Sequence, residues 1–229
     1  MSIADNIRTL KNETVPIKVS LIAVSKTKTV ADIQQAYDAG QRLFGENMVQ
    51  ELMEKHELLP ADIQWHLIGH LQSNKVKYIA PFISMIQSVD SLKLLQEINK
   101  HAEKNDRVID CLLQIYIADE ETKYGLGFDE AIELLRSEEF PQLKNVRIRG
   151  LMGIATNTDI EKQIKEEYYE LKTFFDGVKQ SFFRKDDTFN VLSMGMSADY
   201  KLAIEQGSNM IRVGSTIFGG RVIKHWKNN

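Results

Sequence analysis

The order of apolar segments along the chain constrains its fold more than any other feature. Short apolar runs, many of them β-branched, recur at intervals, and segments with helical spacing separate them. Such alternation of strand and helix is typical of a parallel sheet. The runs lie near residues 19, 43, 65, 84, 110, 148, 190 and 211. Eight repeats of about 27 residues therefore predict an α/β fold in which a (β/α)₈ TIM barrel closes on itself.

The expected elements cover the chain without a linker. A helix precedes the first strand, and the longest helix runs from Ile160 to about Ser181. No Pro/Gly/Ser-rich stretch or repeat interrupts the order, so residues 1–229 are expected to form one domain. An open doubly wound sheet is the alternative, but no G-x-G-x-x-G follows the first strand. The expected strands are 19–24, 43–44, 65–68, 83–87, 108–117, 146–154, 189–192 and 210–213.

Composition narrows the class of protein. The net charge of −3 argues against a nucleic-acid binder, which usually carries a basic face. The single cysteine, Cys111, rules out an internal disulfide and any multi-cysteine metal site. No apolar run approaches the roughly 18 residues of a membrane span, and the N-terminus lacks a signal-peptide pattern. We therefore expect a cytoplasmic protein that has no contact with a membrane.

Lys26 is the first candidate for chemistry, because the active sites of such barrels lie where the strands end. It follows the buried run that ends at Val24, and period-two alternation gives it the same face as Ile22 and Val24. Partial burial lowers the pKa of a lysine, which frees the amine to form a Schiff base with a carbonyl. The alternative is a solvated lysine just beyond a strand.

Polar residues also follow the second and third strands. Glu46 and Asn47 would offer polar atoms over the barrel mouth; alternatively, they form an ordinary helix N-terminus with Asn47 as its cap. His66 and His70 lie four residues apart, but a glycine separates them and no carboxylate or cysteine completes a ligand set. We therefore expect no metal, and from the spacing alone His66 is a packed histidine.

Two segments of small residues follow the last two strands. Segments 193–197 and 212–216 each lead into a helix, and phosphate sites of barrels often lie after strands seven and eight. Backbone N–H groups at helix N-termini bind phosphate, and glycine permits close approach. Arg212 is unusual within this otherwise buried strand end, because a buried guanidinium needs a partner. A structural carboxylate is the ordinary candidate.

A lysine on the first strand and a phosphate site on the last two is the arrangement that barrel enzymes use for pyridoxal 5′-phosphate. With these features the sequence resembles the YggS/PROSC-like pyridoxal phosphate homeostasis proteins. The resemblance extends over nearly the whole chain. It rests on residues 23–26, 44–47, 65–69, 71–75, 149–152, 192–197, 213–214 and 217–219.

The resemblance implies a fold like the barrel domain of alanine racemases, with the cofactor held on Lys26 as a Schiff base. It places Arg212 opposite the pyridine nitrogen, where a permanently charged guanidinium keeps that nitrogen unprotonated. It assigns the phosphate to Ser197, Gly214 and Ser215. The residues expected to line the barrel mouth are Asn47, His66 and Met194.

The function implied is a monomeric, non-enzymatic protein that holds pyridoxal phosphate within the cell and passes it to apo-enzymes. One alternative is a weak amino-acid racemase, which needs a second proton donor opposite Lys26; Tyr124 and Tyr200 are the candidates. Racemases take this tyrosine from a second domain, for which the thirteen residues after Thr216 leave no room. Another alternative is a cofactor-free aldolase or lyase that uses Lys26 directly.

Overall fold

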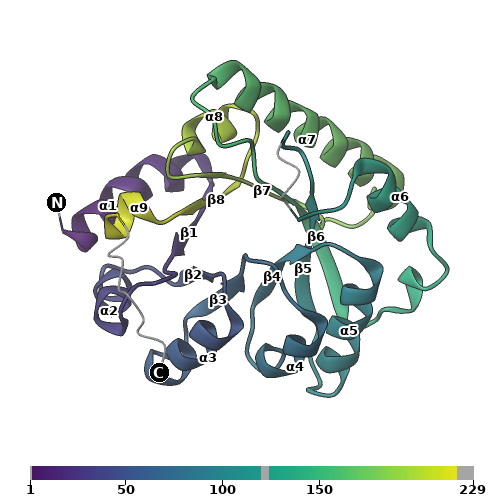
Figure 1. The fold of residues 1–229 in the computed structure, drawn as a ribbon, viewed down its shortest axis with the longest axis horizontal. Coiled ribbons are helices and arrows are strands. Elements are labelled where there is room, and N and C mark those ends of the chain that lie inside the picture. Colours follow the sequence, from purple (N-terminus) through teal and green to yellow (C-terminus); the bar gives the residue numbers. More distant parts are fainter. Residues whose placement is uncertain (1, 120–123, 221–229) are drawn as a thin grey trace.

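The strands form a closed barrel. The computed structural model describes residues 2–119 and 124–220 of the 229-residue chain. Eight parallel strands follow one another in sequence order around the barrel, and β8 pairs with β1 to close it. The helices lie around the outside of this ring (Figure 1). The predicted (β/α)₈ barrel is confirmed.

The elements alternate as expected, and one helix precedes the first strand. The strands are β1 (Ser20–Val24), β2 (Leu43–Glu46), β3 (Gln64–Leu67), β4 (Met85–Val89), β5 (Ile109–Ile115), β6 (Val146–Gly153), β7 (Val191–Met196) and β8 (Met210–Val213). The helices are α1 (Ile3–Thr14), α2 (Val30–Asp38), α3 (Val49–Leu58), α4 (Val76–Ile79), α5 (Leu92–Glu103), α6 (Phe128–Arg136), α7 (Glu161–Phe182), α8 (Tyr200–Glu205) and α9 (Ser215–Phe218).

β4 and β7 depart most from their expected positions, while β2 continues two residues further than expected, to Glu46, and β5 ends two residues earlier, at Ile115. β4 begins at Met85 because the N–H of Ile83 bonds to the carbonyl of Ile79 and extends the helical turn after α4. β7 continues to Met196, through a segment expected to be a loop. Ser193 belongs to this strand although its hydroxyl is buried, because that hydroxyl is hydrogen-bonded on both sides.

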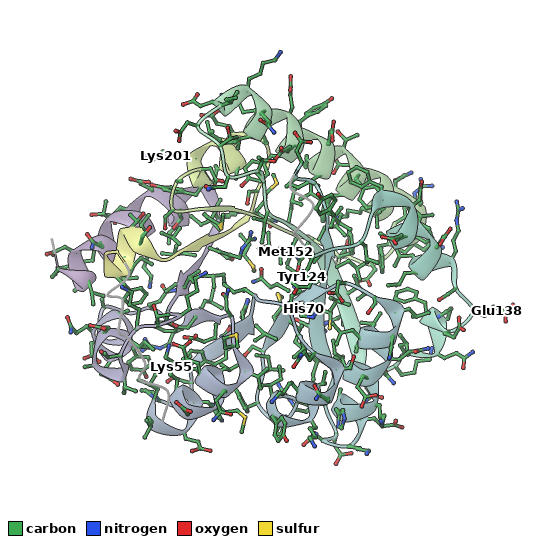
Figure 2. All side chains as sticks on the ribbon, in the orientation of Figure 1. Lys55, His70, Tyr124, Glu138, Met152 and Lys201 are labelled. Carbon is green, nitrogen blue, oxygen red and sulfur yellow. The ribbon has the colours of Figure 1, made fainter. Side chains whose placement is uncertain are left out.

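Alternation along the strands separates two apolar clusters. Leu21 and Ala23 belong to the larger cluster, which includes buried side chains of both the strands and the surrounding helices. Ile22, between them, belongs to a smaller cluster that fills the inside of the barrel. Met152 is part of this inner cluster and lies near the middle of the ring (Figure 2). The barrel is therefore a packed core that leaves its ends for ligands.

Some of the helices around the barrel begin at local capping signals. Ser2 with Asp5 and Thr29 with Asp32 form capping boxes that begin α1 and α2. α9 lies beside α1, where the Asn6 side-chain amide donates to the carbonyl of Ile217. Within residues 2–119 and 124–220, none of the helices has the length and apolar character to cross a membrane.

Gly150 allows β6 to approach β7 closely, which gives a test of the fold. Its φ is +153°, and a Cβ there would overlap the backbone carbonyl oxygen of Val191. We expect Gly150→Ala to lower the free energy of unfolding by more than ~3 kcal/mol, measured by urea denaturation. The matched control is Gly177→Ala at an exposed position of α7, where a Cβ meets nothing within 4 Å. That change should stabilise by ~1 kcal/mol; equal effects would contradict the prediction.

Candidate functional site

A pocket of about 350 Å³ lies at the end of the barrel where the strands finish. This volume is within the usual range for sites of small molecules. Val24, Ile68, Ile154 and Met196 supply apolar surface. Of the eight residues expected at the site, six line this pocket: Lys26, Asn47, Ser197, Arg212, Gly214 and Ser215.

His66 and Met194 lie elsewhere. The side chain of His66 is buried inside the barrel and lines a second cavity, of about 600 Å³, where the strands begin. Burial lowers its pKa to about 4, so the imidazole is neutral near pH 7. Met194 alternates with inward-pointing Ser193 and belongs to the larger apolar cluster, between the strands and the helices. Neither side chain lines the pocket as the resemblance implied, and the packed-histidine interpretation describes His66 better.

The loop that carries Lys26 is fixed on both sides of that residue. The buried Lys55 Nζ donates to the carbonyl oxygen of Ser25 at 2.7 Å. The backbone N–H of Thr27 donates to the Glu51 carboxylate at 2.6 Å, and Thr27 adopts the left-handed conformation with φ of 64°. Both contacts come from α3, so this helix sets the position of Lys26 at the pocket.

A buried ion pair anchors these contacts. Lys55 Nζ lies 2.7 Å from an oxygen of Glu46 and 2.7 Å from Glu51 (Lys55 is labelled in Figure 2). Glu46 Oε1 also accepts from the Ser25 hydroxyl at 2.6 Å, whereas Glu46 Oε2 has no hydrogen-bond partner among the described residues. Burial raises the pKa of Glu46 to about 7, and the opposing charge of Lys55 limits that rise. Glu46 is therefore a loop anchor and contributes no polar atoms to the mouth.

The loop between β8 and α9 offers convergent N–H groups. The backbone N–H groups of Gly214 and Thr216 both point to one oxygen, Ser197 Oγ, at 3.1 and 3.5 Å. Convergence of several N–H groups on one oxygen suits a phosphate. A Cβ on Gly214 would lie 3.2 Å from the Val24 carbonyl oxygen, so a larger side chain would crowd this part of the pocket. The loop thus fits a phosphate group.

Arg212 lines the pocket although it is only 4% exposed. Its Nη1 donates to Ser193 Oγ at 2.7 Å and its Nη2 to the Gly153 carbonyl at 2.8 Å. Both partners are uncharged, and no carboxylate within residues 2–119 and 124–220 forms an ion pair with it. Burial lowers its pKa, and the Tyr168 and Asp199 side chains oppose this. The remaining N–H donors of the guanidinium suit an acceptor such as a pyridine nitrogen.

The two tyrosines considered as second proton donors do not line this pocket. The Tyr200 hydroxyl donates to Glu13 of α1 at 2.9 Å. Tyr124 is 57% exposed and stacks on His70 with ring centroids 4.0 Å apart (Figure 2). The part of the chain that the structure describes also contains no cluster of three metal-ligating side chains. The pocket therefore offers an amine, a guanidinium and phosphate donors.

Known proteins share this fold and much of this sequence. Residues 1–222 match the family model described as alanine racemase, N-terminal domain. The pyridoxal phosphate homeostasis protein of Pasteurella multocida is 39% identical over 206 residues, which cover 89% of this chain and 87% of that protein. The chain belongs to this family. The resemblance to pyridoxal phosphate homeostasis proteins that the sequence motifs indicated is confirmed.

Solved structures agree with this membership. PipY of Synechococcus elongatus with PLP bound has a TM-score of 0.85 and 36% identity, and covers 95% of this chain and 100% of PipY. PipY without PLP has a TM-score of 0.88. An alanine racemase of Bartonella henselae, at 15% identity and a TM-score of 0.69, covers 97% of this chain and 60% of the racemase. That last likeness concerns the fold alone.

The ion pair beneath the Lys26 loop can be tested by removing its cation. We expect Lys55→Met to lower the free energy of unfolding by ~3 kcal/mol, because Glu46 remains buried without its partner. In this variant folded Glu46 stays protonated while unfolded glutamate ionises above about pH 4.5. Stability should therefore fall as pH rises from 5 to 8, which urea denaturation at each pH measures.

Two further variants control this test. Glu46→Gln added to Lys55→Met should remove the extra pH dependence, since no buried carboxyl remains to titrate. Lys162→Met breaks an ion pair of 3.5 Å whose side chains are 83% and 63% exposed, and should change stability little. A Lys55→Met protein as stable as the Lys162→Met protein would contradict the anchoring role.

Proposed function

We propose that this protein binds pyridoxal 5′-phosphate in the barrel-end pocket and acts in cofactor homeostasis as a carrier or reservoir. The observation that carries this proposal is that Lys26, Arg212, Ser197 and the loop between β8 and α9 line one pocket. Relatives named for pyridoxal phosphate homeostasis and the PLP-bound PipY structure support it. In this proposal, residues 1–229 form a single cofactor-binding domain.

Each residue of the proposed site has one task. Lys26 would hold the cofactor as a Schiff base, in which Nζ takes the place of the aldehyde oxygen and that oxygen is released as water. Arg212 would donate to the ring nitrogen, and Asn47 would add a polar contact at the mouth. Ser197, Gly214 and Ser215 would hold the phosphate. His66 and Met194 are left out of this site because their side chains do not line the pocket.

We further propose that the protein has no robust catalytic activity. Arg212 has no proton to give up near neutral pH, so it holds the ring nitrogen unprotonated and weakens the bound cofactor as an electron sink. Within the described residues, the pocket lining offers lysines as its only acid–base side chains. This arrangement supports holding the cofactor more than transforming an amino acid with it.

The proposal extends to the oligomeric state and the cellular location of the protein. We propose a monomer that acts in the cytoplasm and delivers pyridoxal phosphate to apo-enzymes. Cys111, the one cysteine of the sequence, is buried and free, so the fold needs no oxidising compartment. Relatives named as homeostasis proteins agree with delivery or storage of the cofactor.

The attachment residue can be identified by spectroscopy. Wild-type protein mixed with pyridoxal phosphate should turn yellow, and borohydride should then fix one cofactor mass on the chain. Lys26→Ala should lose the visible band and the fixed mass, because the attacking amine is absent. Lys201→Ala, at an exposed position of α8, should behave as wild type. A yellow, borohydride-fixable Lys26→Ala protein would exclude this assignment, and a wild type without a visible band would favour the cofactor-free aldolase.

The weak-racemase alternative predicts a different result. Efficient racemisation needs an acid and a base on opposite faces of the substrate α-carbon, each within about 2.6–3.2 Å or through one water. The described pocket lining places no tyrosine opposite Lys26. Loaded protein incubated with L-alanine should therefore form D-alanine far below ~1 per second, as followed by chiral chromatography. Turnover in the usual enzymatic range of about 1–10³ per second would overturn the carrier proposal.

A further inference from the structure

A hydrogen-bonded series of buried polar side chains runs through the inside of the barrel from the pocket to its opposite end. Arg212 Nη1 donates to Ser193 Oγ at 2.7 Å. The Ser193 hydroxyl donates to Gln87 Oε1 at 2.7 Å, and Gln87 Nε2 lies 2.8 Å from His66 Nδ1. Each of the four side chains is at most 4% exposed. This hydrogen-bonded series therefore connects the guanidinium at the pocket with the histidine at the cavity where the strands begin.

The donors and acceptors of this hydrogen-bonded series have one consistent order. Arginine only donates, so the Ser193 oxygen accepts from Arg212 and its single proton goes to Gln87 Oε1. The Gln87 amide group then donates to His66 Nδ1. A neutral imidazole has an acceptor nitrogen for this bond, and burial keeps His66 neutral near pH 7. Gln87 is the member that accepts on one side and donates on the other.

Arg212 depends on this hydrogen-bonded series for its orientation. Its guanidinium has uncharged partners at only two atoms, Ser193 Oγ and the Gly153 carbonyl, and lacks an ion pair among the described residues. Ser193 can rotate its hydroxyl, so the bond to Gln87 fixes where the serine oxygen presents its lone pairs to Arg212. Hydrogen bonds in such a chain also strengthen one another in a medium of low dielectric constant.

We propose that Gln87 is a positioning residue for Arg212: through Ser193 it holds the guanidinium at the angle that meets the ring nitrogen of the cofactor. Gln87 does not line the pocket and acts only through its neighbours. The inference rests on the proposed function, since it concerns the same cofactor. It adds a residue on β4, a strand that contributes no side chain to the pocket lining within the described part of the chain.

The test uses three variants of β4 with pyridoxal phosphate as the probe. Gln87→Met keeps the approximate size and removes the hydrogen bonds to Ser193 and His66, together with a weak contact of 3.3 Å from Gln87 Nε2 to the sulfur of Met210. Gln87→Glu keeps the acceptor for Ser193, and its protonated form also keeps the donor for His66. Ser88→Ala is the control, because Ser88 is equally buried on the same strand and its hydroxyl has no hydrogen-bond partner among the described residues.

We expect Gln87→Met to weaken cofactor binding about tenfold, equivalent to about 1.4 kcal/mol. The position of its visible band, or the pH at which that band titrates, should also shift, because the ring nitrogen loses an oriented partner. Borohydride should still fix the cofactor on Lys26. Gln87→Glu should restore affinity and spectrum toward wild type, which a merely structural defect would not do, and Ser88→Ala should leave both unchanged.

The outcomes separate this inference from the function on which it rests. Binding and spectra of Gln87→Met that equal those of wild type would overturn the positioning role alone. So would equal losses in Gln87→Met and Gln87→Glu. A Gln87→Met protein that fails to fold leaves the decision to Ser193→Ala, which removes only the linking hydroxyl and should reproduce the spectral shift; an unchanged spectrum overturns the role. A wild-type protein that binds no pyridoxal phosphate would overturn both proposals.

Discussion

A polar group that points into a closed barrel has little access to water and must find its partner inside the ring, because an unpaired buried donor or acceptor costs about 1–3 kcal/mol. Four inward-facing polar side chains meet this requirement together: Arg212, Ser193, Gln87 and His66 form one hydrogen-bonded series. Apolar residues such as Met152 pack around them. The same series that removes unpaired groups from the core therefore also orients the charged group at the pocket.

The two buried cations near the pocket are stabilised in different ways. Lys55 has carboxylate partners, Glu46 and Glu51, and holds the loop that carries Lys26. Arg212 has a hydroxyl and a carbonyl, so none of its donors is taken by a counter-charge from residues 2–119 or 124–220. A carboxylate beside Arg212 would compete with a ligand for the guanidinium. Placing carboxylates under the Lys26 loop and uncharged acceptors beside Arg212 keeps the second cation available to a ligand.

Strand–helix alternation was sufficient to predict the barrel, since period-two and helical spacing depend on local sequence. The predicted end of β7 was wrong because a serine such as Ser193 is typical of a loop, and only its partners on β4 and β8 explain why it lies in a strand. Glu46 and Lys55 show the same limit: the Glu51–Lys55 spacing of four residues signals a helical ion pair. Nothing local shows that Glu46 joins it from a strand. The prediction of the six residues found at the pocket was based on loop positions and family motifs, which locate a residue along the fold. They do not give the direction of its side chain, and for this reason the prediction for Met194 was wrong.

Local charge at the pocket differs from the charge of the whole chain. The net charge is −3, yet the described lining contains Lys26, Lys28 and Arg212 and no carboxylate. Lys28 donates to the carbonyls of Phe218 and Gly219, so its charge stays at the pocket. A concentrated positive field in a cleft attracts anions even to a protein of negative net charge. Because this attraction acts at a distance, before any contact forms, the pocket favours the approach of a phosphorylated ligand.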